Sequence, residues 1–573
     1  MSLIEDLSEQ EINRRNNLQA LRDMGIDPYP AAEYPTDAFS TDIIADFKDD
    51  APQKDVCIAG RMMSRRVMGK ASFVEIQDSK GRIQVYISRD ELCPGEDKEL
   101  YNIVFKKLLD LGDFIGVKGF VFRTQTGEIS VHARELTVLA KSIKPLPVVK
   151  YKDGVAYDKF DDPELRFRQR YVDLVVNEGV KDTFLKRATV LKTLRNVLDG
   201  AGYTEVETPT LQAIAGGASA RPFITHFNAL DIDMYMRIAT ELYLKRLIVG
   251  GFEGVYEIGK NFRNEGMDRN HNPEFTCMEL YVQYKDYNWM MSFTEKLLET
   301  ICVAVNGSAE TKVGDNVISF KAPYRRLPIL DAIKERTGYD LSNMSEEEMK
   351  EVAKKCGVEV DDTMGKGKLI DEIFGETCEG TFIQPTFITD YPVEMSPLTK
   401  MHRSKPGLTE RFELMVNGKE LANAYSELND PIDQEERFKE QMRLSEKGDD
   451  EAMIIDQDFL RALQYGMPPT SGIGIGIDRL CMLMTGQTTI QEVLLFPQMK
   501  PEKKKERDSE QTFNAAGVPS EWVGVLYKMG YNKVDDLKGQ NPNKLFQDLC
   551  GQNKKLKLGL QNPSQELVKS WTE

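Results

Sequence analysis

Five short runs of residues between positions 55 and 140 alternate apolar and polar side chains, and no other feature limits so strongly what this chain can fold into. Alternation with a period of two predicts β-strands that bury one face. Turn signals such as DSKG, LGD and QTGE separate the runs, which read VCIAGRM, SFVEIQD, RIQVYIS, FIGVKGFVFR and ISVHARELTVLA. Five such strands in fewer than about 100 residues predict a small closed barrel.

A helical stretch, KELYNIVFKKLLDLG, lies between the third and the fourth predicted strand. This order of elements is typical of the OB-fold, a five-stranded barrel that can bind oligonucleotides. We therefore expect an OB-fold domain over residues 55–145. Residues 1–54 before it are expected to form a helical segment, in which Arg14 and Arg15 lie on the polar side and are interpreted as facing solvent.

Residues 160–500 follow a linker with two prolines, KSIKPLPVVK, and mix long helices with strands. Regular crossover helices do not join these strands, which favours an antiparallel sheet flanked by helices over a parallel one. A helical insertion is expected over residues 335–380, where Ser345 and Glu348 form a capping box. The predicted fold class is therefore α+β.

Residues 512–573 follow the charged tether KPEKKKERDSEQ and predict a small all-α domain. Its pattern resembles helix-hairpin-helix modules, which hold nucleic-acid backbone through the amides of a turn, here at Gly530. Residues 501–573 carry 12 Lys and Arg against 10 Asp and Glu, a net charge of +2. An auxiliary contact with nucleic acid and a folded appendage for stability or protein partnering both remain open. The expected small core consists of Trp522, Leu526, Val534, Leu537, Leu545, Phe546 and Leu549.

The composition of the 573 residues, 41% hydrophobic and 29% charged, excludes disordered, collagen-like and disulfide-stapled chains. No apolar run approaches the roughly 20 residues of a membrane span. The N-terminus has no apolar signal region, so the expected compartment is the cytoplasm. The net charge of −17 reports the average field and does not exclude a local surface for nucleic acid.

The cysteines and histidines indicate no thiolate or imidazole metal site. No pair of the eight cysteines has C-x2-C spacing, and the four histidines form no H-x3-H pattern. A metal ion in this chain would therefore be expected to have oxygen ligands.

The run from Gly472 to Arg479 alternates glycine with isoleucine. It differs from a dinucleotide-binding fingerprint because Arg479 stands where the third glycine would be. The alternation predicts a strand with one apolar face and one bare face, against which a flat ligand can lie. A tightly packed core strand is the alternative interpretation of this segment alone.

Two further segments combine with this strand. The first is GYTEVETP, residues 202–209, and the second runs from Asn261 through Arg263 and Glu265 to His271 and Phe275. Together the three segments resemble motifs 1, 2 and 3 of class II aminoacyl-tRNA synthetases. The resemblance covers about residues 1–500 and is strongest to the bacterial lysyl-tRNA synthetases. It also includes RFRQRYVDLV, MYMRIATELYLKRLIVGGFE and LANAYSELNDPIDQEERF.

This resemblance implies activation of L-lysine by ATP and transfer to tRNA(Lys). Arg263 would be catalytic, because a planar guanidinium can bind the lysine carboxylate and the α-phosphate together. The adenine would stack between Phe275 and Arg479, Glu265 would accept from its amino group, and His271 would reach the γ-phosphate.

The resemblance also implies the metal and lysine sites. Glu413 and Glu420, interpreted as partners across a hairpin, would hold the Mg²⁺ that bridges ATP phosphates. The side-chain ammonium of lysine would be bound by carboxylates, since a buried ammonium needs them. The residues expected at the lysine are Glu241, Glu427 and Tyr281 for the side chain, and Gly216, Glu279 and Asn423 for the α-amino and carboxylate groups.

The resemblance also implies that the barrel binds the uridine-rich anticodon through Phe73, Gln84 and Glu135. The aromatic ring would stack on a base, and the polar side chains would form hydrogen bonds with the base edges. Motif 1 in this family lies at a two-fold interface, so a homodimer is expected. Two departures from the bacterial pattern concern the loops. In bacterial relatives an arginine often stands directly before this histidine, but here Asn270 precedes His271 and Arg269 lies one residue earlier. Ala215 stands where those relatives often have proline.

Three rival functions remain open at this point. An aspartyl or asparaginyl enzyme would need a cation in the pocket, which Glu241 and Glu427 disfavour. A relative that lysylates a protein or makes a small amide would lack the barrel. A non-catalytic nucleic-acid-binding or scaffold protein would tolerate the loss of Arg263, Glu413, Glu420 or Arg479, and all four are present.

Overall fold

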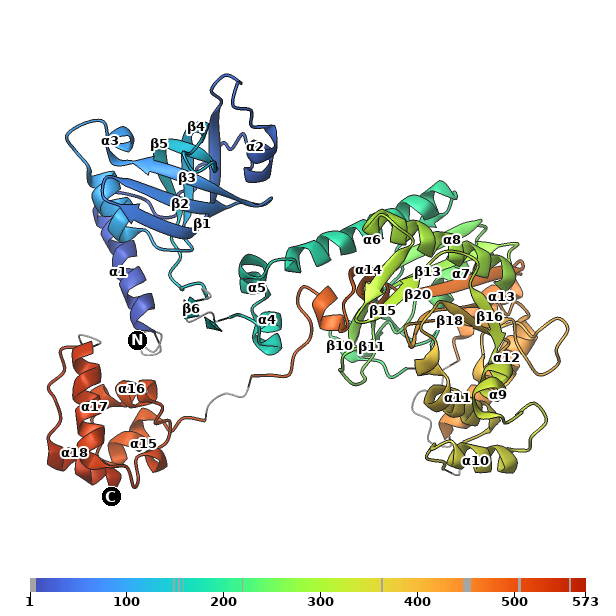
Figure 1. Cartoon of the computed structure of the whole chain (residues 1–573). Helices are drawn as coiled ribbons and strands as arrows, with labels where there is room; N and C mark the ends of the chain where they lie inside the picture. Colours follow the sequence, from blue (N-terminus) through green and yellow to red (C-terminus); the bar gives the residue numbers. More distant parts are fainter. Residues whose placement is uncertain are drawn as a thin grey trace. The chain divides into compact units, whose positions relative to one another are not determined.

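A computed structural model describes residues 7–147, 150–152, 155–157, 159–218, 220–361, 364–446, 455–502, 506–555 and 558–573. The chain divides into two compact units, one of Met1–Lys159 with Pro501–Glu573 and one of Phe160–Lys500. The predicted fold class is confirmed: a β-barrel, a mixed but largely antiparallel sheet with helices, and a helical C-terminal segment are all present (Figure 1). Among the described residues, no helix is long and apolar enough to cross a bilayer.

The N-terminal barrel is closed, in the strand order β1-β2-β3-β5-β4. β1 is long enough to pair with two neighbours, because Asp55–Arg61 pair with β4 and Arg61–Met68 pair with β2. A bulge between Met62 and Ser64 bends β1 between these two partners, and such bends let a sheet close on itself. The strands are β1 (Asp55–Met68), β2 (Ala71–Gln77), β3 (Arg82–Ser88), β4 (Phe114–Arg123) and β5 (Ile129–Ala140).

The helix expected between the third and fourth strands is present as a π-helix, η1 (Leu100–Leu108). Its Tyr101, Val104 and Phe105 are buried in the barrel core. The other helices of this segment are α1 (Glu9–Asp23), α2 (Ser40–Asp46) and α3 (Arg89–Leu92). The linker after the barrel ends in a two-stranded sheet of β6 (Lys150–Lys152) and β7 (Val155–Tyr157), and residues 148 and 149 lie outside the described residues.

The expectation that Arg14 faces solvent is wrong. Its guanidinium is buried and donates to the carbonyl oxygens of Leu111, Ser142 and Lys144 at 2.8–3.3 Å. These carbonyls lie at the end of the barrel, so Arg14 attaches α1 to it. Arg15 is exposed, as expected.

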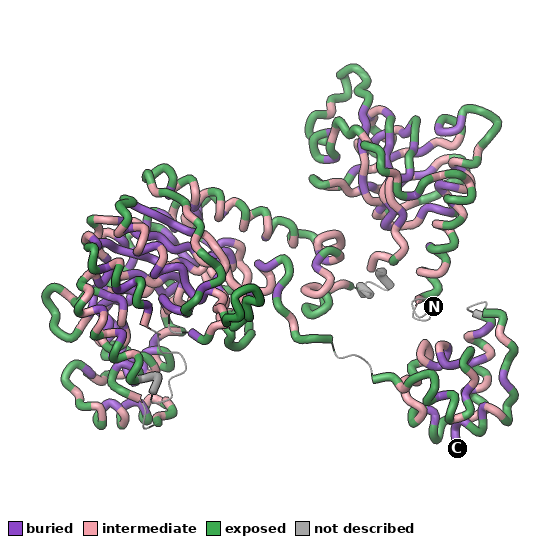
Figure 2. Tube along the Cα trace, turned by 180° about the vertical axis from the view of Figure 1, so that it is seen from behind, coloured by how far each residue is buried: buried purple, intermediate pink, exposed green. Residues whose placement is uncertain are grey.

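The second unit is built on an eight-stranded sheet in the order β16-β17-β18-β19-β20-β13-β12-β8. Pairing from β17 to β12 is antiparallel throughout, and the two outermost pairs are parallel. Figure 2 shows buried residues concentrated in this sheet. Its strands are β8 (Thr204–Glu205), β12 (Gly254–Phe262), β13 (Glu274–Gln283), β16 (Arg325–Pro328), β17 (Thr386–Thr389), β18 (Arg411–Val416), β19 (Lys419–Ser426) and β20 (Thr470–Gly476).

Three helices, α6, α8 and α14, cover one face of this sheet with a continuous apolar core. Ile473 and Ile475 of β20 belong to that core, which leaves the glycine face of β20 on the opposite side. The helices of the unit outside the insertion are α4 (Pro163–Arg168), α5 (Arg170–Val176), α6 (Val180–Gly200), α7 (Glu241–Val249), α8 (Tyr287–Asn306), α12 (Pro431–Glu446), α13 (Gln457–Gln464) and α14 (Ile477–Thr485), with short 3₁₀ turns η3 (Val393–Met395) and η4 (Ile490–Val493).

Two small sheets and the helical insertion complete the unit. The sheets contain β9 (Leu211–Gln212), β10 (Ile224–Phe227) and β11 (Ile232–Met236), and β14 (Glu310–Val313) with β15 (Asn316–Ser319). The insertion consists of α9 (Ile329–Thr337), α10 (Glu346–Lys355), α11 (Lys366–Thr377) and η2 (Glu379–Thr381). The capping box is confirmed, since the Glu348 amide donates to Ser345 Oγ and the Ser345 amide donates to Glu348 Oε2.

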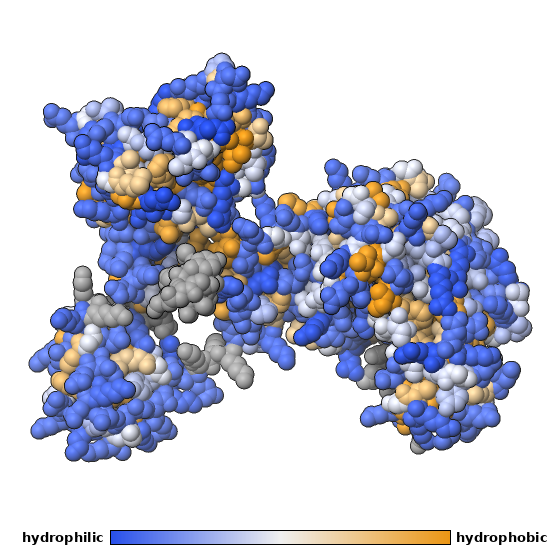
Figure 3. Space-filling model, in the orientation of Figure 1, coloured by the Kyte–Doolittle hydropathy of each residue, from blue (hydrophilic) through white to orange (hydrophobic). Residues whose placement is uncertain are grey.

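The C-terminal segment folds around its own core. All seven residues expected in it belong to one apolar cluster, together with Phe513 and Trp571. Gly530 ends a helix in the left-handed conformation, at φ 94°. The face of this segment seen in Figure 3 is largely hydrophilic. Its helices are α15 (Glu510–Ala515), α16 (Ser520–Met529), η5 (Val534–Asp536), α17 (Pro542–Lys555) and α18 (Gln565–Thr572).

Candidate active site

A cavity of about 1290 Å³ opens on the glycine face of the large sheet. The strands β12, β13, β18, β19 and β20 form its floor, and Met364–Asp371 of the insertion form part of its wall. The second and third motif segments therefore meet in one cavity, although 196 residues separate Phe275 from Gly472. Residues 202–209, the first segment, are not among those that line it.

Most of the predicted site residues line this cavity. They are Glu241, Arg263, Glu265, His271, Phe275, Glu279, Tyr281, Glu413, Glu420, Asn423 and Arg479. Of the residues expected at the ATP, metal and lysine sites, two do not line it: the neighbouring Gly217 takes the place expected for Gly216, and Glu427 is buried behind the wall.

Arg263 and Arg479 bring two guanidinium groups to one end of the cavity. Arg263 lies over the ring of Phe275, with Cζ 5.2 Å from the ring centroid. Arg479 donates to the carbonyl oxygen of Glu420 at 2.7 Å and lies 3.1 Å from Nε2 of His271. The Nδ1 of that histidine lies 2.9 Å from the Asp268 carboxylate, which orients the ring. This end therefore presents cations and one aromatic face, as expected for a nucleotide.

The bare face predicted for the glycine strand is confirmed. Gly472, Gly474 and Gly476 line the cavity together with Ile473, and both Ile473 and Ile475 are buried and belong to the apolar core. A Cβ at Gly474 would meet nothing closer than 3.8 Å, so open space lies above it. At Gly472 a Cβ would lie 2.3 Å from both Glu427 Oε1 and the Tyr281 ring, so only glycine fits there.

Glu413 and Glu420 both reach the cavity, but they are not direct partners across the hairpin. A bulge between Leu414 and Met415 shifts the register, so that Glu413 pairs with Asn423 and Glu420 pairs with Met415. Burial, together with the charge of Glu420, raises the pKa of Glu413 to about 7 against the opposing effect of Arg411. Arg411 donates to Glu413 Oε1 at 2.5 Å.

The two carboxylates fit a divalent cation, because a cation would compensate negative charge that burial and their mutual repulsion make unfavourable. Among the described residues, no group of three or more His, Cys, Asp or Glu side chains could hold a metal ion. Phosphate oxygens and water would therefore have to complete the coordination, as is usual for Mg²⁺.

Buried carboxylates and tyrosine hydroxyls form the other end of the cavity. Glu279 accepts from the Thr240 amide and from the Tyr281 hydroxyl, both at 3.1 Å. Burial raises the pKa of Glu279, and the charge of Glu241 adds to the rise. Glu241 Oε1 accepts from the Tyr425 hydroxyl at 2.6 Å. Such an end attracts cationic groups.

The Glu241 carboxylate and the buried Glu427 share a cation that belongs to the chain itself. Lys245 Nζ lies 2.5 Å from Glu241 Oε1 and is ion-paired with Glu427 Oε2. The side chains of Lys245 and Glu427 have no exposed surface. Glu241 and Glu427 therefore lie beside one ammonium, which is that of Lys245, and their contact with the substrate lysine stays a prediction.

Comparison with known proteins decides the family. Residues 162–500 match the model for "tRNA synthetases class II (D, K and N)", and residues 56–139 match the model for "OB-fold nucleic acid binding domain". The lysine–tRNA ligase of Porphyromonas gingivalis is 66% identical over 575 aligned positions, which cover 100% of this chain and 99% of the relative. The chain belongs to the lysine–tRNA ligases of class II.

Two further lysine–tRNA ligases differ in how much of the chain they match. That of Azobacteroides pseudotrichonymphae is 65% identical over 497 residues, which are 87% of this chain and 99% of the relative. That of Christiangramia forsetii is 64% identical over 539 residues, 94% of this chain and 93% of the relative. About 76 residues of this ligase thus have no counterpart in the Azobacteroides protein.

Ligases of this class depend on ATP and use tRNA as a substrate, and the barrel matches the family model of an OB-fold nucleic acid binding domain. Phe73 packs on Tyr86 with ring centroids 5.2 Å apart, and Tyr86 continues to His132 at 4.8 Å. Gln84 donates to Ser130 Oγ at 2.9 Å, and Glu135 accepts from Lys118 at 2.8 Å. All of these groups lie on the outer side of the barrel strands.

Sequence reasoning missed several groups of this ligase. Arg411 and Tyr425 line the cavity, and Lys245 lies behind it. The spacing of Glu241 and Lys245, four residues apart on α7, was a signal that both share one helix face. The alternation of β19 was a signal that Tyr425 shares the face of Asn423. No comparable signal marked the insertion residues.

The two departures from the bacterial pattern lie in different surroundings, one at the cavity and one in an apolar cluster. Asn270 lines the cavity and Arg269 does not, although the Arg269 carbonyl oxygen accepts from the Ile490 amide at 2.8 Å. Ala215 is buried in a small apolar cluster with Ala220 and Ile238.

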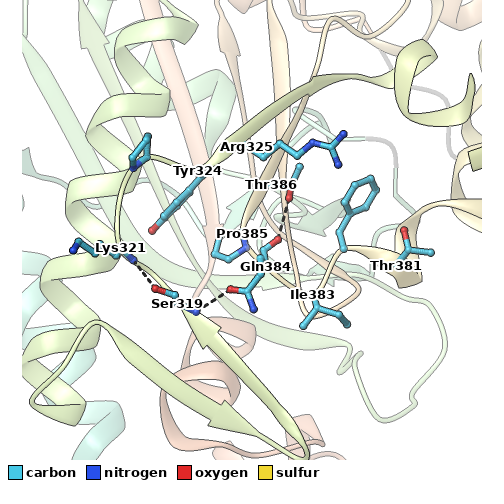
Figure 4. Close-up of a pocket in the computed structure, with 11 residues that line it drawn as sticks. Ser319, Lys321, Tyr324, Arg325, Thr381, Ile383, Gln384, Pro385 and Thr386 are labelled. Atoms are coloured by element: carbon cyan, nitrogen blue, oxygen red, sulfur yellow. Dashed lines mark hydrogen bonds between the residues drawn. The ribbon is translucent and has the colours of Figure 1, made fainter. Parts of the chain in front are cut away.

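A second cavity, of about 480 Å³, lies beside β16 and β17 (Figure 4). Its wall contains Tyr324, Lys321 and Arg325 but no carboxylate, and Gln384 crosses its floor to accept from the Ser319 amide at 3.0 Å. None of the predicted site residues lies in it.

We expect Gly474→Val to abolish amino-acid activation while leaving the protein folded. The space above Gly474 accepts a side chain without a clash, but that side chain occupies the cavity floor. A misplacement of about 1 Å at a reacting centre costs roughly 100-fold in rate, so we expect at least this loss in ATP–pyrophosphate exchange.

The matched control is Gly380→Val, because a Cβ at Gly380 meets nothing within 4 Å and Gly380 lies outside the cavity. Equal exchange rates in the two variants would contradict the placement of substrate on β20.

Proposed function

We propose that the large cavity is the place where this ligase activates L-lysine with ATP before transfer to tRNA(Lys). The proposal rests on one observation: the cavity has Arg263 and Arg479 at one end, and buried carboxylates at the other. A zwitterionic amino acid with a cationic side chain can lie between them, with its carboxylate toward Arg263 and its ammonium groups toward Glu279 and Glu241.

The first reaction joins two anions, since the lysine carboxylate attacks the α-phosphorus of ATP and pyrophosphate leaves. Arg263 is the proposed catalytic residue: its guanidinium binds both reactants and neutralises charge that develops at the α-phosphate. The product is lysyl-adenylate. A terminal ribose hydroxyl of tRNA then attacks its carbonyl carbon, which gives the lysyl ester and releases AMP.

In the proposed ATP site, the adenine lies between the ring of Phe275 and the guanidinium of Arg479. Glu265 accepts a hydrogen bond from the adenine amino group. Arg479 donates to the Glu420 carbonyl oxygen, and His271 lies beside it. His271 would then be placed for the γ-phosphate. Glu413 and Glu420 would hold Mg²⁺, which when bound supplies neutralisation of phosphate charge.

The proposed lysine site uses Glu241 and Tyr281 for the side-chain ammonium, with Glu427 behind them. Glu279 would bind the α-amino group, and Asn423 would contact the carboxylate. The backbone at Gly216 and Gly217 would close this end, since Gly217 lines the cavity.

The barrel is proposed to bind the anticodon through Phe73, Gln84 and Glu135. The support is an aromatic platform that continues from Phe73 across Tyr86 to His132. Bases stack on such a platform whatever their identity, and neighbouring polar groups select among them.

A homodimer is proposed on the basis of exposed apolar side chains near motif 1. Leu211, Ile224, Phe227, Leu230 and Ile232 are all exposed on the small β9-β10-β11 sheet. Contiguous exposed apolar side chains are typical of interfaces, and closed two-fold pairs are the commonest assembly.

The C-terminal segment is proposed to be auxiliary to lysine activation. The support is that its apolar core, among the described residues, contains only members of this segment and none that line the large cavity of the other unit. Contact with tRNA through the turn at Gly530 and protein partnering are both compatible with a separately folded appendage. Because a tRNA ligase serves translation, we place its work in the cytoplasm.

Lysine alone of the twenty amino acids should drive strong ATP–pyrophosphate exchange without tRNA. Glu241→Gln removes one charge-assisted contact, which is worth about 1.5–3 kcal/mol, so the KM for lysine should rise roughly 10- to 100-fold. Glu310→Gln, an exposed change on β14, serves as the control. Faster exchange with aspartate or asparagine would refute the lysine assignment, and an unchanged KM would remove Glu241 from the site.

Phe73→Ala should weaken tRNA charging and spare the exchange reaction, because the platform lies in the barrel and the chemistry in the other unit. Stacking is worth about 1–3 kcal/mol per base, so the KM for tRNA should rise in proportion. A parallel loss of exchange would indicate misfolding and count against an anticodon role.

Analytical ultracentrifugation at micromolar concentration should give a particle near twice the 65.1 kDa of one chain. Charged substitutions at Ile224 and Leu230 should shift it to the monomer, since a buried charge opposes association. A monomer in the unaltered protein would overturn the dimer.

A further inference from the structure

Arg263, the proposed catalytic residue, comes directly after the last residue of β12. Its guanidinium lies over the ring of Phe275, with Cζ 5.2 Å from the ring centroid. Its buried Nε has no hydrogen-bond partner among the described residues. The place of this guanidinium therefore depends on the backbone that carries it, which is the end of β12.

The two edges of β12 are paired to different extents. On one edge, β13 pairs with every residue of the strand from Gly254 to Phe262. On the other edge, β8 pairs with Val255 and Tyr256 and then ends. The backbone groups beyond Tyr256 on this second edge need other partners, because amides and carbonyls of a sheet are rarely left unpaired.

Arg237, the residue after β11, supplies such partners at the end of the strand. The Phe262 amide donates to the Arg237 carbonyl oxygen at 2.9 Å, and Arg237 Nε donates to the Lys260 carbonyl oxygen at 2.8 Å. One residue thus bonds to β12 through its main chain and through its side chain. The two bonds lie one and three residues before Arg263.

The guanidinium of Arg237 is itself held in a buried cluster against the strand. A Cβ at Gly259 would lie 2.1 Å from Arg237 Nη2, so only glycine allows this close approach. Arg237 Nη1 lies 2.5 Å from Glu257 Oε1, and both side chains are 5% exposed. Glu257 Oε2 accepts from the amide and the hydroxyl of Thr208 at 3.1 and 2.7 Å. These bonds fix the Arg237 side chain in one orientation.

We propose that Arg237 is a positioning residue for Arg263: its bonds to Lys260 and Phe262 fix the end of β12, and so the guanidinium that meets both reactants. Arg237 and Glu257 are not among the residues that line the cavity, so Arg237 acts through the backbone and not on the substrate. This inference rests on the proposed role of Arg263. The competing explanation is that Arg237 only compensates the buried charge of Glu257.

A variant that removes both buried charges separates the two explanations. Arg237→Met leaves Glu257 without its cation, and Glu257→Gln leaves Arg237 without its anion, so each should lower the thermal unfolding midpoint. The combined variant contains no unpaired charge at this place and should recover most of the lost stability. It still lacks the bond to the Lys260 carbonyl oxygen.

The experiment measures the unfolding midpoint and kcat in ATP–pyrophosphate exchange with lysine for these three variants. We expect kcat to fall roughly 10- to 100-fold in Arg237→Met and to stay as low in the combined variant, because a misplacement of about 1 Å costs up to about that factor. Glu257→Gln keeps the bond to Lys260 and should lose less. Arg325→Met, which breaks an exposed pair with Glu335, is the matched control and should keep the kcat of the unaltered enzyme.

Recovery of kcat together with stability in the combined variant would overturn the proposal, and so would an unchanged kcat in Arg237→Met. The combined variant decides the matter even where Arg237→Met alone unfolds, because its charges are balanced.

A second comparison tests the route through Arg263. Arg263→Lys with and without Arg237→Met should give the same kcat, since residues that act through one another are not additive. A further loss of kcat on adding Arg237→Met would contradict the proposal. Full kcat in Arg263→Lys would instead refute the catalytic assignment of Arg263, independently of Arg237.

Discussion

The hydrogen-bonded register of three neighbouring strands, β19, β20 and β13, determines where the groups of this active site lie. Gly474 stands between Asn423 and Glu279, and Gly472 stands between Tyr425 and Tyr281. Each of these four side chains therefore borders a glycine, and open space lies above Gly474. Because side chains alternate between the two faces, a slip of one residue would exchange the cavity face for the core face. The isoleucines between the glycines oppose such a slip, since they belong to the core under α6, α8 and α14.

Local sequence patterns predicted the strands and helices, and the family resemblance named residues of the site. They did not predict which residues pair with each other across long distances in the sequence. The period of two in the five N-terminal runs and in the glycine strand predicted strands that are present, and the family resemblance supplied residues that meet in the cavity. Pairings that depend on distant parts of the chain were missed. Arg14 bonds to a carbonyl 128 residues away, and Lys245 pairs with Glu427 across 182 positions. The bulge that separates Glu413 from Glu420 in register also has no local sign in the sequence.

The local charge at the nucleotide end of the site is opposite in sign to the net charge of the whole chain. The chain carries a net −17, yet the nucleotide end of the cavity presents Arg263 and Arg479. The carboxylate end in turn holds a cation of its own. Average charge thus describes solubility and the long-range field, while the proposed site depends on the local charge of a few buried groups.

The separately closed core of the C-terminal segment has a consequence for how such chains change over time. Among the residues that the structure describes, its apolar cluster contains only members of the range from Phe513 to Trp571 and none from the barrel or the large sheet. A gene could therefore lose or gain the coding region for this segment without exposing apolar surface elsewhere or repacking the catalytic sheet. Among related ligases, length at this end of the chain is thus free to vary in a single genetic step, whereas insertions within the sheet would have to preserve its register.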